Sequence, residues 1–565
     1  MNMNNKTCNN SFFHQSLADT NVLVLVPHQD DEINLMRDLL VSLQNCKATV
    51  YVAYTTNGDY SVPANVRYQE AIESLRILGV PKEQIIFLGY GDSFNTAPNR
   101  HIFYADSEPS ISNAGYSETY GAEGIKELVY QVTGHHHEYL KDNYIADMEL
   151  LLEQINPAII FGIDYDTHPD HRMLSLGLDR ALRNMRAKNS SFKPVVYKGF
   201  AYVTAFHSYP DFYDSINLAS IKEPREPHTY HYFGDRDVYG SSIYQWSNRV
   251  RFPVTEHNSG PFLWNSPLFK AIKAHTSQSF GFKATAVMNS DIVFWQRRTD
   301  SIAYDAAIEV SSNPDTKDRL VDFKLFDISD INSLEPVLDP LAWTSSGEDT
   351  QSSIQLTWAK AQDIRQIVLY SAIDFGEPSR ECTVYIDNQE VGRVIVPPKG
   401  QPLVLTLDRT CHAYQMRIVF DGPIALAELE VYGTALQANP LQSFIKIMKD
   451  DDFIYDYYVD NQKQYLDISL YTYMADANDV TLTIDSESII ERDDDRYMIR
   501  FSQSAREVIV RATINGNEAC YDQVVIHRVS KQALGMRKRL QQLDKYANLF
   551  FLRLQRKWYY LFQKQ

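Results

Sequence analysis

Two short stretches of the chain combine imidazole and carboxylate side chains at close spacing. Residues 27–32 read PHQDDE, and residues 168–171 read HPDH. A set of histidines and aspartates that leaves one coordination position open is what a catalytic zinc ion requires. Pro169 suits the first turn of a helix, where His168 and His171, at positions i and i+3, would share one face. Together, the two stretches predict a catalytic metal site.

Each stretch has a simpler interpretation when it is taken alone. The acidic run can serve as a helix cap that faces the helix dipole, and HPDH can be a surface turn. Both stretches, however, follow apolar, strand-like runs, NVLVLV (21–26) and PAIIFGI (157–163). Two such stretches at two strand ends favour one shared site over two unrelated structural features.

The elements that must position these residues alternate as in an α/β protein. Short apolar strands at 21–26, 48–54, 84–89 and 157–163 alternate with helices at 33–44, 65–78 and 142–156. This order predicts a parallel, Rossmann-like sheet. Open α/β sheets bind ligands at the carboxyl ends of their strands, so Pro27 and Ile163 are expected on one edge.

The two motifs resemble those of a known enzyme family. PHQDDE is similar to the (A/P)HPDDE motif of the PIG-L/LmbE-like (GlcNAc-PI de-N-acetylase) family, and THPDHR (167–172) is similar to its HPDH motif. Similar segments also occur at TTNGD (55–59), LGYGDS (88–93) and KAIKAHTSQ (270–278). The resemblance covers about residues 20–300 and implies a metal-dependent deacetylase.

The resemblance also implies a role for each matched residue. The metal ligands would be His28, Asp31 and His171, the general base Asp30, and the group that stabilises or protonates the reacting amide His168. Substrate contacts would come from Arg67 and Asp92, and Glu32 is expected to orient a ligand. Zn²⁺ is the expected cofactor, although a site of two histidines and one aspartate also accepts Fe²⁺ or other divalent ions.

Some positions have alternatives or depart from the family pattern. Arg67 can instead pair with Glu70 at i+3, and Asp92 can be an ordinary turn residue. Gln29 stands where the family usually has proline, which removes rigidity but no ligand. Asp166 stands where the family has tyrosine, which affects the leaving-group side of the site.

Two further histidine motifs are not expected to do chemistry. The run 135–138 reads HHHE, but three consecutive side chains point in different directions in any regular structure, so a second metal site is disfavoured. His275 and Gln278 are interpreted as a packing motif.

Residues 200–300 are irregular and aromatic and are assigned to the first domain as its substrate-side wall.

Beyond the first domain the pattern is that of β-structure. Strands are predicted at 354–358, 365–370, 383–387, 403–407, 416–420 and 425–433, and then at 465–474, 480–485, 496–501, 507–516 and 522–529. Both sets predict β-sandwiches. The first ends in ALAELEVYG and resembles the galactose-binding-like, discoidin-type fold, which implies glycan binding, with a structural or dimerisation role as the alternative.

The last segment, 531–565, is predicted to be a basic amphipathic helix. It contains nine Lys/Arg residues and one Asp, interleaved with aromatic and aliphatic side chains. Such a helix can lie in an anionic membrane interface, so a membrane surface is a candidate partner. Docking on the acidic body of the chain or on a partner is the alternative.

The predicted units are an N-terminal extension at 1–20, the deacetylase domain at 21–305, sandwiches at 310–435 and 440–530, and the basic amphipathic helix at 531–565.

Length and composition limit the function classes. A chain of 565 residues is too long for one core. A net charge of −18 argues against a general nucleic-acid binder. The five cysteines lack a CxxC spacing and are expected as free thiols. Because neither a signal peptide nor a run of 18 apolar residues occurs, a cytoplasmic location is expected, with a peripheral position on the inner face of the membrane as an extension.

The expected function is metal-dependent hydrolysis of the N-acetyl group of a GlcNAc-type amino sugar, in a glycan or lipid-linked glycan biosynthetic pathway. One alternative is a deacetylase of a small thiol-sugar glycoside. The other is a non-enzymatic glycan-binding protein with a vestigial metal site, which is disfavoured because all five expected catalytic positions carry competent residues.

Overall fold

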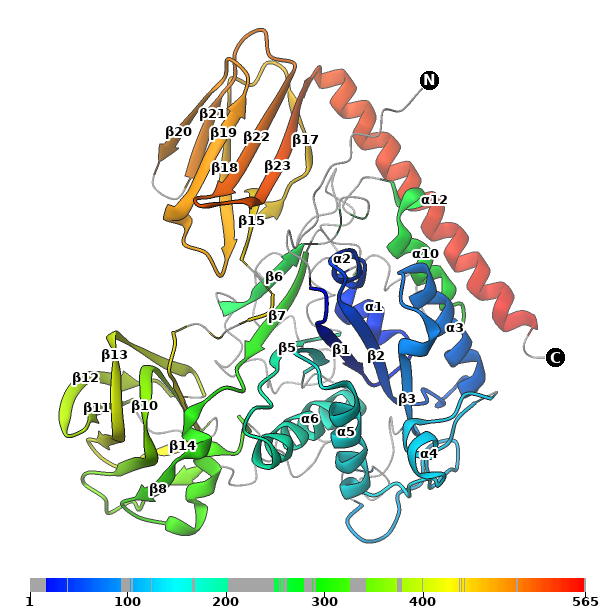
Figure 1. Cartoon of the computed structure of the whole chain (residues 1–565). Helices are drawn as coiled ribbons and strands as arrows, with labels where there is room; N and C mark the ends of the chain where they lie inside the picture. Colours follow the sequence, from blue (N-terminus) through cyan, green and yellow to red (C-terminus); the bar gives the residue numbers. More distant parts are fainter. Residues whose placement is uncertain are drawn as a thin grey trace.

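The computed structural model of the chain contains a mixed β-sheet with helices, two sets of mainly antiparallel β-strands and a long C-terminal helix (Figure 1). The structure describes residues 17–37, 39–92, 102, 105–122, 124–164, 168–201, 248–253, 255, 258, 262–278, 287, 291–325, 342–372, 379–398, 400–435, 437, 439–441, 443–493 and 496–562.

The first sheet has seven strands in the order β3-β2-β1-β4-β5-β7-β6. Five strands are parallel: β1 (Asn21–Val26), β2 (Thr49–Thr56), β3 (Ile85–Tyr90), β4 (Ile159–Ile163) and β5 (Val195–Gly199). Two strands, β7 (Asp291–Arg297) and β6 (Val250–Pro253), add antiparallel pairs at one edge. The four strands predicted from the sequence are confirmed, and β5 extends the parallel part. The sheet is therefore mixed, and its finer description as Rossmann-like stays a prediction.

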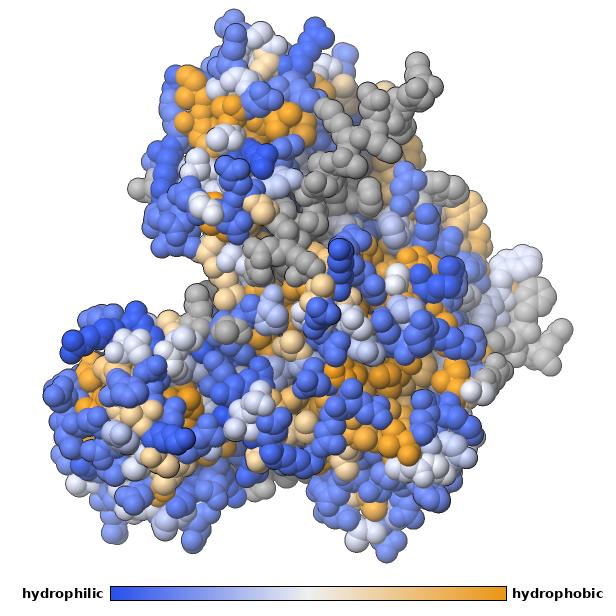
Figure 2. Space-filling model, viewed as in Figure 1, coloured by the Kyte–Doolittle hydropathy of each residue, from blue (hydrophilic) through white to orange (hydrophobic). Residues whose placement is uncertain are grey.

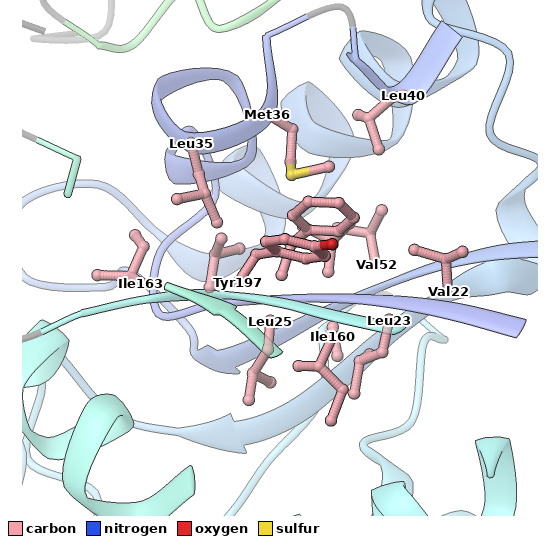
Figure 3. Close-up of a cluster of buried hydrophobic side chains, with 14 of the residues drawn as sticks. Val22, Leu23, Leu25, Leu35, Met36, Leu40, Val52, Ile160, Ile163 and Tyr197 are labelled. Carbon is pink, nitrogen blue, oxygen red and sulfur yellow. The ribbon is translucent and has the colours of Figure 1, made fainter. Parts of the chain in front are cut away.

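The central strand β1 is buried on both faces, which explains its unbroken apolar run. Successive side chains of a strand point to opposite faces. Leu23 and Leu25 accordingly lie on the face opposite Val22 and Met36 (Figure 3). Complete burial of such a side chain contributes about 1.5–3 kcal/mol. The sheet that carries the motifs is thus a rigid, well-packed support.

The helices around this sheet match the sequence prediction with one exception. Helices α3 (Ala64–Ile77), α5 (Lys141–Ile155) and α6 (Pro169–Lys188) form as expected. The single helix predicted at 33–44 is wrong, because the structure has α1 (Asp31–Met36) and α2 (Leu39–Asn45). The break falls at Arg37, whose φ is 50°. Its buried guanidinium donates a hydrogen bond to the carbonyl of Asp291 at the start of β7.

The second β-region contains longer strands than the sequence predicts. Residues 353–371 form one strand, β10 (Ser353–Ser371), and residues 402–420 form β13 (Pro402–Phe420), where two short strands were predicted in each case. Shifts in the register between β10 and β13 interrupt the regular alternation, which explains the two apparent strands. Besides these, the sheet contains β8 (Ala307–Val310), β9 (Trp343–Thr344), β11 (Arg380–Ile386), β12 (Gln389–Val396) and β14 (Ala425–Tyr432).

The third region is formed by a five-stranded and a four-stranded sheet over one core. The five predicted strands are confirmed as β18 (Tyr465–Tyr473), β19 (Val480–Asp485), β21 (Arg496–Arg500), β22 (Glu507–Ile514) and β23 (Asn517–Val529). The other strands are β15 (Phe444–Lys449), β16 (Asp452–Phe453), β17 (Asp456–Asp460) and β20 (Ile489–Asp493). The chain then continues into α12 (Lys531–Phe562), which confirms the predicted terminal helix.

Polar contacts join the first sheet to the third region. Arg251 on β6 donates to Asp291 at 2.6 Å and to Asp451, which follows β15, at 2.7 Å. Tyr197 on β5 contacts Tyr473 on β18 through their hydroxyl groups at 2.5 Å. The face viewed in Figure 2 is mainly hydrophilic, with separate hydrophobic patches. Among the described helices, none combines the length and apolar character needed to cross a membrane.

Candidate functional site

The two motifs emerge at the same edge of the first sheet. PHQDDE follows β1, and HPDH begins α6 after β4. Strands β1 and β4 pair in parallel, with Leu25 opposite Gly162, so their carboxyl ends are neighbours. Between β1 and α1, Asp30 has a φ of 151° and a ψ of −16°, a conformation that side chains rarely adopt. This sharp turn places His28 and Asp31 in contact.

His28, Asp31 and His171 meet through one carboxylate oxygen. Oδ2 of Asp31 lies 3.0 Å from Nδ1 of His28 and 3.1 Å from Nε2 of His171. The side chains of Asp31 and His171 are fully buried. Oδ1 of Asp31 accepts a hydrogen bond from Asn34 at 3.1 Å, which orients the carboxylate. The structure thus brings together the three residues that the sequence singled out as metal ligands.

Two more carboxylates face the other nitrogen of His28. Nε2 of His28 lies 3.1 Å from Oδ2 of Asp170 and 3.7 Å from Oδ2 of Asp92. Sequence reasoning assigned Asp92 to the substrate and gave Asp170 no role. The signal for Asp170 was present, because it stands between the two histidines of HPDH and would come to the same place as His171.

The donor set fits a metal ion. Ligand atoms of His28, His168 and His171 lie within 4.8 Å of one another, and so do those of His28, Asp92, His168 and Asp170. Asp31 belongs to neither group, although its Oδ2 lies close to both His28 and His171. In a tetrahedral zinc site with bonds of about 2.0 Å, the ligand atoms are about 3.3 Å apart. The 3.0 and 3.1 Å separations around Asp31 are close to that value. Nitrogen and carboxylate donors of this kind suit Zn²⁺ and also Fe²⁺.

The carboxylates control the protonation of the histidines. Burial disfavours a charged His28, but its hydrogen bonds to Asp170 and Asp31 outweigh burial and raise its pKa well above the ordinary value. Burial likewise disfavours an ionised Asp31, yet His171 and His28 hold its pKa well below the ordinary value. A metal ion would therefore compete with protons for the nitrogen of His28.

His168 differs from the other two histidines in its environment. It caps α6, and its Nδ1 accepts a hydrogen bond from the backbone N–H of Asp170 at 3.2 Å. Burial, followed by the charges of His28 and His171, lowers the pKa of His168 well below its ordinary value. In the neutral ring the proton is therefore on Nε2, which can act as a hydrogen-bond donor. Its ring centroid is 4.6 Å from that of His28.

Asp30 is held by Arg67. A guanidinium nitrogen of Arg67 donates to Oδ1 of Asp30 at 3.1 Å and to the carbonyl of Gln29 at 2.8 Å. The side chain of Gln29 donates to the carbonyl of Thr56 at 2.7 Å. Gly58 in the TTNGD segment lies against this cluster with a φ of 61°, and a Cβ there would be only 2.5 Å from Oε1 of Gln29.

The alternative interpretation of Arg67 as a partner of Glu70 does not account for its contacts. Glu70 accepts two hydrogen bonds from Ser277, one from the backbone N–H and one from the hydroxyl, each at 2.7 Å. These bonds join α3 to the segment that follows α10 (Pro267–Ala274). Arg67 therefore pairs with Asp30 and not with Glu70.

Asp92 lies after β3 and is supported by a second acidic residue. Its backbone N–H donates to Oδ1 of Asp59 at 2.8 Å, and Oδ2 of Asp59 accepts from the hydroxyl of Tyr120. Asp59 belongs to TTNGD, so three separate segments converge here. Asp92 thus lies at the edge of the cluster, beside Nε2 of His28.

Glu32 and His275 form a buried pair. Oε1 of Glu32 accepts from Nε2 of His275 at 2.7 Å, and both side chains are fully buried. This hydrogen bond joins Glu32 to the end of α10. The role of Glu32 in orienting a metal ligand stays a prediction. This contact agrees with the interpretation of His275 as a packing residue.

The 135–138 run is tied down by separate carboxylates. His136 contacts Glu127, and Nδ1 of His137 lies 2.8 Å from Asp147. Within the described residues, the groups that could hold a metal are those around His28. Asp166 lies outside the described residues.

Comparison with known proteins agrees with this arrangement. Residues 23–182 match the family model for PIG-L, the GlcNAc-PI de-N-acetylases. This range runs from β1 through most of α6 and includes both motifs. The chain therefore contains a PIG-L domain at residues 23–182. No curated protein matches the chain.

Several solved structures show weak likeness to parts of the chain. The N,N'-diacetylchitobiose deacetylase of Pyrococcus horikoshii is 20% identical, over 31% of this chain and 52% of its own, with a TM-score of 0.20. A fucose binding module of Streptococcus pneumoniae is 18% identical, over 24% and 95%, with a TM-score of 0.19. The lectin domain of Lectinolysin is 18% identical, over 24% and 97%, with a TM-score of 0.20. Likenesses at this level carry no weight for function.

Proposed function

We propose that the protein is a metal-dependent de-N-acetylase that releases acetate from a GlcNAc-type amino sugar. The observation that carries this proposal is the meeting of His28, Asp31 and His171 at one carboxylate oxygen, with Asp30 and His168 beside them. A PIG-L domain at 23–182 supports the same chemistry. We propose His28, Asp31 and His171 as the metal ligands and Zn²⁺ as the metal, with Fe²⁺ as the alternative.

Bound by these three residues, the ion would supply a Lewis acid and lower the pKa of water in the site. Asp30 takes the proton of the attacking water as the water oxygen bonds to the acetyl carbon. Arg67, 3.1 Å from Asp30, orients that carboxylate through a charge-assisted hydrogen bond. When the carbon–nitrogen bond breaks, Asp30 returns the proton to the departing amine.

His168 stabilises the oxyanion in this mechanism. Because its Nδ1 accepts from the backbone of Asp170, its Nε2–H is the group that can donate to the negative oxygen. The low pKa of His168 means that it acts as a neutral donor, and proton delivery to the amine is left to Asp30. Of the two roles expected for His168 from the resemblance, stabilisation of the reacting amide is the one proposed.

The substrate is proposed to be a glycan or a lipid-linked sugar, with Asp92 contacting its hydroxyl groups. A lipid-linked form would bring residues 531–565 to a membrane surface and keep the enzyme on its cytoplasmic face. The division into an extension at 1–20, a catalytic domain at 21–305, sandwiches at 310–435 and 440–530 and a terminal helix is part of the same proposal.

Acetate release from a panel of substrates tests this function. The metal-replete protein would be assayed with GlcNAc-terminated oligosaccharides, lipid-linked GlcNAc and small thiol-sugar glycosides, with Asp30→Ala as the control. Release that disappears in the control supports the deacetylase and identifies its substrate class. Release from the small glycosides alone would replace the proposed substrate. No release despite bound metal would favour a glycan-binding protein.

A further inference from the structure

The terminal helix α12 has two apolar faces, and only one of them is covered. Leu549 and Leu552 are buried in the core of the first domain. A separate set of large apolar side chains is exposed on the same helix. We call this set the outer face; it consists of Met536, Leu540, Leu543, Phe550, Leu554, Trp558 and Leu561, whose exposed fractions range from 36% to 70%.

Helix geometry places the outer face opposite the docked face. An α-helix has 3.6 residues per turn, so residues nine apart point in opposite directions. Leu540 is nine residues from Leu549, and Leu543 is nine residues from Leu552. The spacings of three, four and seven residues within the outer face keep its members on one side. The stripe is therefore continuous over most of the helix.

Hydrogen bonds hold α12 in this orientation. Asp544 accepts from the backbone N–H of Leu263 at 2.8 Å, and the hydroxyl of Tyr560 donates to the carbonyl of Ser277 at 2.6 Å. At the other end, the guanidinium of Arg537 lies 3.7 Å from the ring centre of Tyr458 on β17. With contacts at both ends and in the middle, the helix cannot turn its outer face inward without losing them.

The charges along the outer face are all positive. Arg539, Arg553 and Lys557 are exposed and lie along one edge of the stripe. Asp544 is the only acidic residue of α12, and its carboxylate is used on the docked side. An exposed apolar patch of this extent marks an interaction site. Its partner must accept both apolar side chains and positive charge.

We propose that the outer face of α12 binds an anionic lipid bilayer, with the helix lying in the plane of the interface. An apolar face with Trp, Phe and Leu, bordered by Lys and Arg, is what such binding requires. Pairing with α12 of a second copy is disfavoured because it brings two basic edges together. The chain as a whole carries a net charge of −18, so anionic lipid attracts this helix and repels the rest.

The same helix is connected to the candidate active site. Tyr560 contacts Ser277, which binds Glu70, and Arg67 stands one turn before Glu70 on α3. Docking through the outer face would therefore hold the PIG-L domain next to the bilayer. The inference deepens the lipid-linked form of the proposed function, but vesicle binding can be measured without any deacetylase activity.

Flotation of the 565-residue protein with vesicles tests the inference. The vesicles would contain phosphatidylcholine alone or phosphatidylcholine mixed with phosphatidylglycerol. We expect binding to the mixed vesicles, and its loss in a Leu543→Ser/Phe550→Ser/Leu554→Ser variant. Each basic residue near an anionic surface contributes about fivefold in affinity, so Arg539→Gln/Arg553→Gln/Lys557→Gln should lower affinity on the order of a hundredfold at low salt.

An Ile395→Ser/Val404→Ser variant is the matched control, because it removes exposed apolar side chains from the second β-region. It should bind vesicles like the unaltered protein, and so should Asp30→Ala. Absence of binding to mixed vesicles, or equal binding by the outer-face variant, would overturn the proposal. A dimer of the unaltered protein that the outer-face substitutions convert to a monomer, without vesicle binding, would assign the face to a second copy. Vesicle binding without acetate release would refute only the deacetylase.

Discussion

Replacing Asp170 with Asn tests how the candidate metal centre is supported. Oδ2 of Asp170 lies 3.1 Å from Nε2 of His28, whereas Asp31 lies 3.0 Å from Nδ1 of the same ring. If Nδ1 binds the metal, Nε2–H donates to Asp170, which fixes the tautomer and the orientation of the ring. Asn preserves the size of the side chain but removes the negative charge that raises the basicity of His28.

The expected loss follows from this geometry. Removing an outer carboxylate of this kind typically lowers metal affinity 10–100-fold, which is about 1.4–2.7 kcal/mol. Asp92 provides a matched control because its Oδ2 is 3.7 Å from the same nitrogen, beyond hydrogen-bond distance. Asp92→Asn should therefore lower zinc affinity less than Asp170→Asn does, because Asp92 acts on His28 through its charge without a hydrogen bond.

Competition between the protein and a chelator would measure zinc affinity, and acetate release at saturating zinc would measure activity. We expect Asp170→Asn to bind zinc more weakly and to regain part of its activity when zinc is in excess. Unchanged zinc affinity would refute the supporting role of Asp170. A loss far beyond a hundredfold would show instead that Asp170 is itself a ligand.

Three further changes test other parts of the structure. Gly58→Ala places a Cβ 2.5 Å from Oε1 of Gln29 at a φ of 61°, so urea unfolding should show a loss of about 2–4 kcal/mol in the free energy of unfolding. In the metal-free protein, the raised pKa of His28 adds stability that is fully present below the unfolded value of about 6.5 and is lost as the pH rises through the folded value. The thermal midpoint of chelator-treated protein should therefore fall from mildly acidic to alkaline pH. Arg251→Met leaves the buried carboxylate of Asp291 without its 2.6 Å partner and should lower the free energy of unfolding by about 3–5 kcal/mol in urea.

Each of these results can contradict its reasoning. An unchanged unfolding curve for Gly58→Ala would mean that neither the backbone conformation nor the close contact matters for stability. A pH-dependent fall that persists in chelator-treated His28→Gln would assign it to other groups. An Arg251→Met protein as stable as the original would show that the buried pair of Arg251 and Asp291 contributes little to stability.

Local sequence patterns were sufficient for the parallel core. Strands at 21–26, 48–54, 84–89 and 157–163 were predictable because burial on both faces demands an apolar run in each strand. The meeting of PHQDDE with HPDH was predictable as well, because the carboxyl ends of adjacent parallel strands share an edge. Both inferences depend only on neighbours in sequence and on general rules of α/β architecture.

Other elements depended on contacts that no local pattern contains. The break between α1 and α2 falls where Arg37 reaches the carbonyl of Asp291, 254 residues away. Strands β10 and β13 are continuous because they pair with each other across two irregularities of register. The alternation of apolar and polar residues in the sequence cannot distinguish such an irregular long strand from two short ones.

The sequence by itself determined the residue types of the site and the edge of the sheet at which they gather. The tertiary structure alone decided their partners. Asp170 meets His28 across 142 residues, and His275 meets Glu32 across 243. The tertiary structure also decided which apolar face of α12 is buried. The physical reason is that periodicity sets which residues share a face, whereas the packing of distant segments selects what that face contacts.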